Sequence, residues 1–250
     1  MITCNLMGGM GNQLFQWAAS QAAAKAHKTE CYYLAPYFLG ESDWKFSLYE
    51  FGLKPKILEQ HLFVFPEIQD DFHYRPFPND SYLNGYWQSE KYFEKNKDTL
   101  RKELEINDER KYHIMNTYPF LKDETVSLHV RRGDYLKASH VHPSQTLDYY
   151  NKAVDLITKS DTNILVFSDD IKWCKENFKY NNMHFAENQT NVTDMHSMSL
   201  CSHNIIANSS FSWWGAWLNN NVDKKVIAPK NWFANGTYSG DIVPESWTTI

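Results

Sequence analysis

The stretch Ser127-Leu128-His129-Val130-Arg131-Arg132-Gly133-Asp134-Tyr135 begins as an apolar, alternating run and ends in two arginines, a glycine and a carboxylate. Apolar side chains at every second position predict a half-buried β-strand, and Gly133 permits the turn that ends it. Because side chains alternate along a strand, His129 and Arg131 are expected on one face and Arg132 on the other. The sequence therefore predicts a strand with a strongly charged carboxyl end.

Two consecutive arginines at a strand end can form an anion site. Arginine presents a planar fork of donors that matches phosphate oxygens, so Arg131 and Arg132 could clamp a diphosphate, with Asp134 orienting them. The alternative is a surface ion pair, which any Arg-Arg-x-Asp sequence can form. The residues of this motif alone leave both interpretations open.

The composition excludes several classes of protein. The chain has 250 residues, enough for one large or two smaller domains, and its formal net charge is -5. A chain without a basic excess is not a general nucleic-acid binder, so any phosphate that it recognises is bound locally. The absence of a Cys-x-x-Cys pair predicts neither a disulfide framework nor a zinc knuckle. The four cysteines are Cys4, Cys31, Cys174 and Cys201.

The sequence has no segment with the order of a signal peptide. No apolar run approaches the roughly 18 residues of a membrane-spanning helix. We therefore expect a cytoplasmic protein, with at most peripheral attachment to the inner face of the membrane.

A glycine-rich turn near the amino terminus leads into a helix that is expected over residues 12–27. Glycines at a helix start let the backbone approach an anion, and amide side chains there can cap the helix or hold a sugar hydroxyl. Tight packing of the helix on its sheet explains the same glycines. The candidate ligand contacts of this turn are Gly9, Gly11, Asn12 and Gln13.

From about residue 125 the pattern alternates strands with helices, which predicts a parallel, doubly wound sheet. Ligands of such sheets bind beyond the carboxyl ends of the strands, where the charged clusters of this chain lie. The expected strands are 125–130, 164–167, 183–185, 204–207 and 226–228, and the helices between them are 145–159, 170–178, 193–202 and 210–219.

Two further polar clusters follow strands of this expected sheet. In Ser168-Asp169-Asp170 a carboxylate could accept hydrogen bonds from a guanine base; a helix N-cap and a poor metal site are the alternatives. Asn208-Ser209-Ser210 starts a helix, where hydroxyls and amides could bind a second phosphate. The tryptophans that follow are expected in the core.

The middle of the chain is less regular. Residues 36–78 are aromatic and proline-punctuated, a short strand is expected within Tyr82–Gln88, and a charged helix is expected over about 90–105. The rings near residue 86 contact either an acceptor or the core. Periodicity fades over residues 107–122, so a boundary is expected there, with domains 1–115 and 116–250.

Three motifs are similar, in order and spacing, to glycosyltransferase family 11, the α-1,2-fucosyltransferases. They are Gly8-Gly9-Met10-Gly11-Asn12-Gln13-Leu14-Phe15-Gln16, His129-Val130-Arg131-Arg132-Gly133-Asp134-Tyr135 and Asn208-Ser209-Ser210-Phe211-Ser212-Trp213-Trp214-Gly215-Ala216-Trp217. Residues 201–207 and 227–233 also resemble that family. The resemblance spans nearly the whole chain and is thinnest over residues 36–78.

The resemblance implies an α/β, GT-B-like fold of two Rossmann-type halves whose parallel sheets face a central cleft. It implies inverting, metal-independent transfer of fucose from GDP-fucose to the 2-hydroxyl of a terminal β-galactoside in a glycan, without a cofactor. The carboxyl-terminal half would bind the donor and the amino-terminal half the acceptor. A GDP-sugar-binding protein and a GDP-sugar hydrolase are the alternatives.

The donor contacts that the resemblance implies lie at the strand ends. Arg131 would meet the leaving β-phosphate, with Arg132 in support. His129 and Asp169 or Asp170 would hold the GMP part, and Ser209 or Ser210 the phosphates. Ser168 and Asn208, which begin the two polar clusters, are further candidate donor contacts. Asp134 is a candidate base for the acceptor hydroxyl, although an aspartate beside arginines is better suited to orient them.

Overall fold

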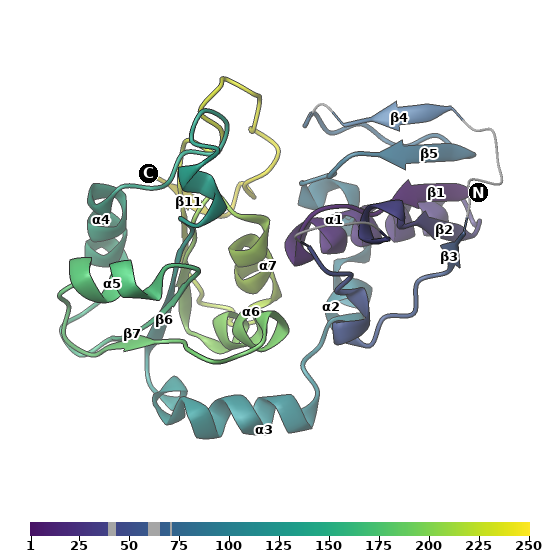
Figure 1. Cartoon of the computed structure of the whole chain (residues 1–250). Coiled ribbons are helices and arrows are strands. Elements are labelled where there is room, and N and C mark those ends of the chain that lie inside the picture. The colour runs from purple at the N-terminus through teal and green to yellow at the C-terminus, as the bar shows by residue number, and fades with distance from the viewer. Residues whose placement is uncertain (40–43, 60–65, 71) are drawn as a thin grey trace. The chain divides into compact units, whose positions relative to one another are not determined.

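The computed structural model describes residues 1–39, 44–59, 66–70 and 72–250, so parts of the region expected to be irregular lie outside the described residues. The chain forms two compact units. The first is Met1–Glu105 with Tyr238–Pro244, and the second is Ile106–Thr237 with Glu245–Ile250. The boundary expected at residue 115 differs from this division, because it falls within the helix Asp108–Thr117, which belongs to the second unit. Figure 1 shows a sheet with covering helices in each unit.

The first unit has a five-stranded parallel sheet in the order β3-β2-β1-β5-β4. The strands are β1 (Ile2–Asn5), β2 (Cys31–Leu34), β3 (Ile57–Leu58), β4 (Glu67–Gln69) and β5 (Ser81–Asn84). Helix α1 (Met10–Ala26) packs on this sheet through a face rich in alanine, which allows a close approach.

The helix expected over residues 90–105 is interrupted. Short 3₁₀ turns at Glu90–Tyr92 and Glu94–Asn96 precede α2 (Lys97–Glu103). Phe93 lies between the two turns with a non-helical backbone and a fully buried ring. Burial of this ring therefore overrides the helical pattern of the charged residues around it.

The second unit has a six-stranded sheet in the order β11-β10-β9-β6-β7-β8, and every pairing in it is parallel. The predicted parallel, doubly wound sheet is therefore confirmed, and only the short edge strand β11 was not expected. The strands are β6 (Thr125–Val130), β7 (Asn163–Ser168), β8 (Met183–Phe185), β9 (His203–Ile205), β10 (Val226–Ala228) and β11 (Thr248–Thr249); the helices are α3 (Asp108–Thr117), α4 (Leu147–Ile157), α5 (Ile171–Asn177), α6 (Asn191–Leu200) and α7 (Ser210–Leu218).

Side-chain alternation assigns each face of this sheet to its own helices. Leu128 and the other apolar residues of β6 pack with α4 and α5, whereas Phe167 of β7 packs with α3 and α6. Figure 1 accordingly shows α4 and α5 on one side of the strands and α6 and α7 on the other. The ring of His129 lies 5.6 Å from that of Phe211, so His129 faces α7.

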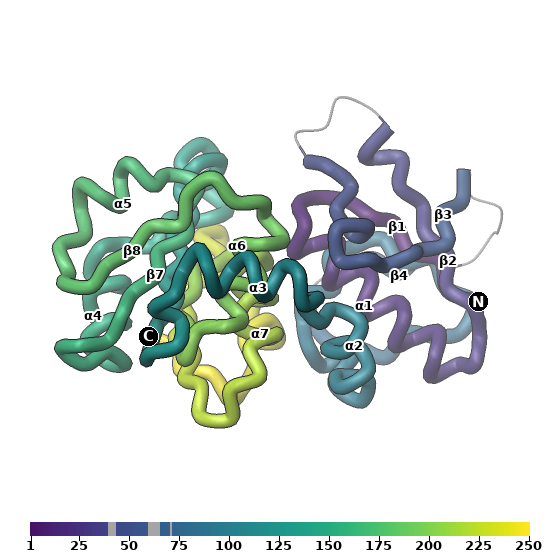
Figure 2. Tube along the Cα trace, turned by 90° about the horizontal axis from the view of Figure 1, so that it is seen from below, coloured from purple at the N-terminus to yellow at the C-terminus, as the bar shows by residue number. Residues whose placement is uncertain are grey.

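Helix α3 forms where no periodicity was apparent. Ile114 is the buried residue of this helix, and it packs with Leu165 and Phe167 of β7. Figure 2 shows α3 beside α6, with which it is in contact. Because Ile114 is the one fully buried residue of α3, the sequence of this helix has no apolar stripe from which it could be predicted.

No helix within the described ranges is long and apolar enough to cross a membrane. All four cysteines are buried and free. Burial raises the pKa of Cys4 and of Cys201, so these thiols pack as small apolar groups.

A buried amide network joins β9 to its neighbours. The Nδ2 group of Asn204 donates to Ser127 Oγ at 2.7 Å and to the Met198 carbonyl at 2.8 Å. The Oδ1 atom of Asn204 accepts from Asn219 Nδ2 at 2.9 Å. Because Asn204 is 0% exposed, removing it would leave several buried polar groups without partners.

We expect Asn204→Ala to lower the free energy of unfolding by about 1–3 kcal/mol, the usual cost of an orphaned buried polar group. Urea unfolding followed by circular dichroism measures this difference. Asn181→Ala, at an exposed position, is the control and should leave stability unchanged. Equal stability of the two variants would contradict a stabilising role for the network.

Asp194 in α6 gives the fold a dependence on pH. Its Oδ1 atom is buried without a hydrogen-bond partner among the described residues, and burial raises the pKa of Asp194 to about 7. A carboxyl whose pKa is higher in the folded state contributes fully below its unfolded value near 4, and that stability is lost as the pH rises through about 7.

Asp194→Asn removes this penalty and should therefore be more stable than the wild type at pH 8, by roughly 1–3 kcal/mol. At pH 4.5 the variant should show no such gain, because the wild-type carboxyl is then protonated. Urea unfolding of both proteins at the two pH values measures the difference. An equal gain at both values would contradict the titration of Asp194.

Candidate functional site

Strands β6 and β7 end opposite each other in the second unit. The residues that follow them therefore leave the sheet side by side, with Arg131 and Arg132 after β6 and Asp169 and Asp170 after β7. Both arginine side chains are about four-fifths buried, at 20% and 19% exposure. The structure thus brings together two clusters that were predicted separately from the sequence.

Arg131 is held by two carboxylates. Its Nη2 atom lies 2.7 Å from Asp134 Oδ1, and its Nη1 atom lies 3.1 Å from Asp169 Oδ2. Its guanidinium carbon lies 5.5 Å from the centre of the Tyr135 ring. The expected orienting contact of Asp134 is present, and it is also the ion pair that the alternative interpretation described.

Arg132 is fixed on the side of α5. Its Nε atom lies 3.1 Å from Asp170 Oδ2, and its backbone N–H donates to Asp169 Oδ1 at 2.9 Å. Its guanidinium carbon lies 4.0 Å from the centre of the Trp173 ring, in cation–π geometry. The guanidinium of Arg132 is consequently held by the carboxylate of Asp170 and by the ring face of Trp173.

The carboxylates after β7 have structural partners. Asp170 Oδ1 accepts from the Trp173 N–H at 3.1 Å as the N-cap of α5, which is the helix-cap role considered from the sequence. Ser168 Oγ accepts from the Asp170 N–H at 2.9 Å. Asp169 is shared between the two arginines. Contact of these residues with a guanine therefore stays a prediction.

Gly133 lies close to Asp169. A Cβ atom at position 133 would lie 2.7 Å from Asp169 Oδ2, which is too near for an unperturbed contact. A side chain there would therefore push Asp169 away from Arg131.

His129 is a buried, neutral group beside the arginines. Its side chain is 4% exposed, and its Nδ1 atom has no hydrogen-bond partner within the described part of the chain. Burial, and then the charge of Arg131, lower the pKa of His129 to about 3. An uncharged imidazole with an unused nitrogen fits a contact to a polar ligand.

Asn208 joins the loops before α7. Its Nδ2 group donates to the Trp232 carbonyl at 2.9 Å, and its Oδ1 accepts from Gln145 Nε2 at 3.0 Å. Its carbonyl accepts from the Tyr135 hydroxyl at 2.8 Å. The side chain of Asn208 therefore has a structural role at the edge of the site, and its contact with a ligand stays a prediction.

Ser209 is the N-cap residue of α7 but makes no capping bond with its side chain. Its side chain is 6% exposed, and Ser210, the next residue in the sequence, is partly exposed. The tryptophans of α7 are buried, as expected for core residues. The two serines remain candidates for phosphate contacts at this helix end.

In the first unit, the glycine turn is tightly packed. Gly8 has a φ of +75°, which favours glycine, and a Cβ on Gly9 would lie 3.1 Å from the Trp44 ring. Gly11 is buried in the first turn of α1. The Oδ1 atom of Asn12 accepts from Gln88 Nε2 at 2.8 Å.

Gln13 is occupied entirely by this unit. Its Nε2 group donates to the carbonyls of Gly8 and Lys45 at 2.9 and 2.8 Å, and its Oε1 accepts from the Ser47 N–H at 2.8 Å. With 0% exposure and both amide donors used, Gln13 fixes the turn. The expected contact of this side chain with a ligand is not supported.

Sequence reasoning missed side chains that complete the cluster around the arginines. Trp173 is the third residue after Asp170, the N-cap of α5, and so lies in the first turn of that helix. This spacing could have predicted that Trp173 lies beside the charged cluster. Tyr135 belongs to the charged motif itself, but its contact with Arg131 was not predicted. The others, His142 and Gln145, lie in or beside loops without periodicity and gave no signal.

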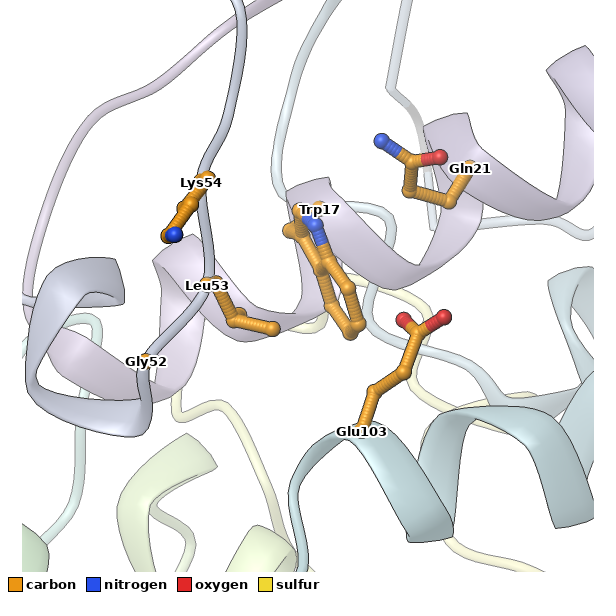
Figure 3. A pocket seen from close by; sticks show the side chains of 6 residues that line it. All are labelled: Trp17, Gln21, Gly52, Leu53, Lys54 and Glu103. Atoms are coloured by element: carbon orange, nitrogen blue, oxygen red, sulfur yellow. The ribbon is translucent and has the colours of Figure 1, made fainter.

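A cavity of about 410 Å³ lies elsewhere, in the first unit. Figure 3 shows its lining side chains, which come from α1, α2 and the segment around residue 53. No predicted site residue lines it; the lining residues are Trp17, Gln21, Gly52, Leu53, Lys54 and Glu103. In the described part of the chain no three His, Cys, Asp or Glu side chains gather as metal ligands, and a metal-free reaction stays a prediction.

Comparisons with known proteins identify the family of this chain. The model of glycosyl transferase family 11 matches residues 40–250. An O-antigen biosynthesis glycosyltransferase, WbnK of Escherichia coli, is 32% identical, with 100% of both chains covered. An α-1,2-colitosyltransferase of Escherichia coli is 31% identical, with 100% of this chain and 99% of the relative covered.

A solved structure of NodZ, an α-1,6-fucosyltransferase from Bradyrhizobium, matches the fold with a TM-score of 0.53. Its sequence identity is 13%, and the match covers 87% of this chain and 92% of NodZ. The two parallel sheets and their helices form the α/β, GT-B-like fold of such enzymes. The chain belongs to glycosyltransferase family 11.

Proposed function

We propose that this glycosyltransferase moves fucose from GDP-fucose to the 2-hydroxyl of a terminal β-galactoside, with inversion and without a metal ion. Relatives named for O-antigen biosynthesis and for α-1,2 transfer support a glycan acceptor. The structure of NodZ soaked with GDP-fucose supports a GDP-sugar donor for this fold. The relatives suggest the substrates, and the charged residues of this chain suggest how the transfer is catalysed.

The observation that carries the proposal is the pair of arginines fixed at the carboxyl end of β6. As the bond between fucose and phosphate breaks, negative charge grows on the departing GDP. Preorganised guanidiniums stabilise such charge without reorganisation at the moment of reaction. In this proposal Arg131 meets the β-phosphate and Arg132 supports it.

The donor would displace the carboxylate of Asp134 from Arg131. The side chain of Asp134 is 51% exposed, so its ion pair with Arg131 is screened by water and weak. Asp169 is less exposed and would keep Arg131 in place. A diphosphate could then replace Asp134 on one side of the guanidinium.

The remaining donor contacts follow the same edge of the sheet. The neutral imidazole of His129 would hold the nucleoside part through its Nδ1 atom, which is buried and has no hydrogen-bond partner in the described part of the chain. Ser209 and Ser210 would bind phosphate at the start of α7. Asp169 and Asp170 would contact the base through lone pairs that the arginines do not use.

Exposed rings in the first unit support an acceptor surface there. Tyr37 and Tyr49 are 42% and 60% exposed, and the rings of Phe38 and Phe46 connect them at centroid distances of 4.8 to 5.6 Å. Trp87, by contrast, is 1% exposed and belongs to the core. The acceptor sugar would therefore stack on the rings of residues 37–49 that the structure describes.

GDP-colitose is a second donor to test, because the relative that is 31% identical to this chain is named a colitosyltransferase. Colitose differs from fucose by the loss of one hydroxyl, so one donor pocket could accept either sugar. Purified protein should be incubated with each GDP-sugar, with and without lactose. A fucosylated lactose supports the proposal, free fucose indicates a hydrolase, and binding without turnover indicates a sugar-binding protein.

Arg131→Ala should lower kcat by about 10²- to 10³-fold, the usual effect of losing one preorganised donor. Arg131→Lys should recover little, because an ammonium cannot replace the planar fork. Release of GDP from GDP-fucose in the presence of lactose measures turnover.

Lys152→Ala is the control for Arg131. Lys152 forms an exposed ion pair with Asp148 in the same unit, and its loss should leave turnover unchanged. Wild-type turnover in both Arg131 variants would refute the clamp on the leaving group.

A further inference from the structure

The segment after the arginines brings a histidine beside the ion-paired cluster. The His142 ring stacks on the Tyr135 ring, with centroids 4.9 Å apart and planes inclined by 19°. The ring of Phe233 lies 5.7 Å from it. The backbone N–H of His142 donates to the Ala138 carbonyl at 2.9 Å. The imidazole is therefore oriented by aromatic packing and by a local turn.

Tyr135 connects this imidazole to the site. Its hydroxyl donates to the Asn208 carbonyl just before α7, which fixes the ring. The guanidinium of Arg131 lies over the same ring at 5.5 Å. Arg131, Tyr135 and His142 consequently form one contiguous group in the second unit, and Asp134 directly precedes Tyr135.

The surroundings of His142 keep its imidazole uncharged near neutral pH. Burial lowers the pKa of His142; Asp134 opposes this shift, and Arg131 and His140 add to it. Burial also raises the pKa of Tyr135, so the ring stacked on His142 stays neutral. The Nδ1 atom of His142 is buried and has no hydrogen-bond partner among the residues described, while the residue as a whole is partly exposed. Contact with a substrate is therefore expected on the exposed part of this neutral ring, which has the capacity to accept a proton.

Asp134 is the other candidate for that task, but its carboxylate is 51% exposed to water, whereas the imidazole of His142 is held between two aromatic rings. Transfer to a hydroxyl requires a proton acceptor. We propose that His142 is the base that takes the proton of the acceptor hydroxyl, an inference that rests on the proposed function. The hydroxyl oxygen forms the bond to the anomeric carbon as its proton passes to the imidazole. The bond from that carbon to the β-phosphate oxygen breaks, and its electron pair leaves with GDP.

His142→Phe separates this role from packing, because it keeps a ring against Tyr135 and removes both nitrogens. The full-length variant should lose about 10²- to 10⁴-fold in kcat, the usual share of a general base. It should also lose the low-pH limb of the kcat profile, while its affinity for GDP, measured by calorimetry, is retained. His142→Gln should behave alike, and added imidazole should restore part of the activity of either variant.

Two variants serve as controls in the same assay with GDP-fucose and lactose between pH 5 and 9. Asp134→Asn should keep the low-pH limb, because the base remains. His140→Phe, at an exposed position in the same segment, should keep wild-type turnover at pH 8.

Turnover of His142→Phe within about threefold of the wild type, with an unchanged low-pH limb, would overturn the assignment. Loss of GDP affinity with the rate would overturn it as well, since His142 would then support the donor site. If neither His142 variant folds, His142 serves to pack the segment, and its assignment as the base is overturned. Absence of wild-type turnover would overturn the proposed function and this inference with it.

Discussion

The site depends on the register between β6 and β7. Two adjacent guanidiniums repel each other, and they share one strand end only because carboxylates lie beside them. Parallel pairing supplies these carboxylates from the next strand, where Asp169 contacts Arg131 and Asp170 contacts Arg132. A shift of one residue would leave one of the two arginines opposite a neutral residue, either Ser168 or Ile171. The charges are therefore positioned by the sheet as much as by the motif.

Much of this arrangement could be predicted because parallel strands bring their carboxyl ends to one edge. The alternation along β6 located the arginines, and the strand before Ser168 located the second cluster. The pairing of particular carboxylates with particular arginines could not be read, because it depends on register between strands about 37 residues apart in the sequence.

Other predicted contacts have structural partners that come from distant parts of the chain. Gln13 is a reasonable ligand contact in its local turn, but its amide group also bonds to Lys45 and Ser47. Asn208 likewise bonds to Gln145 and Trp232, and ligand contact of either amide stays a prediction. Amides are good ligands and equally good structural connectors, and a single sequence does not distinguish the two uses.

Burial gives the charged cluster neutral neighbours. The imidazoles of His129 and His142 are kept uncharged by lowered pKa values, and the pKa of Tyr135 is raised. The positive charge at this edge therefore comes from guanidiniums, which stay protonated in proteins. Under the proposed function, a diphosphate would replace the half-exposed Asp134 carboxylate on such a guanidinium. Water would solvate the displaced carboxylate and the guanidinium would keep an anionic partner, so the cost of burying the donor would be smaller than at a site of isolated cations.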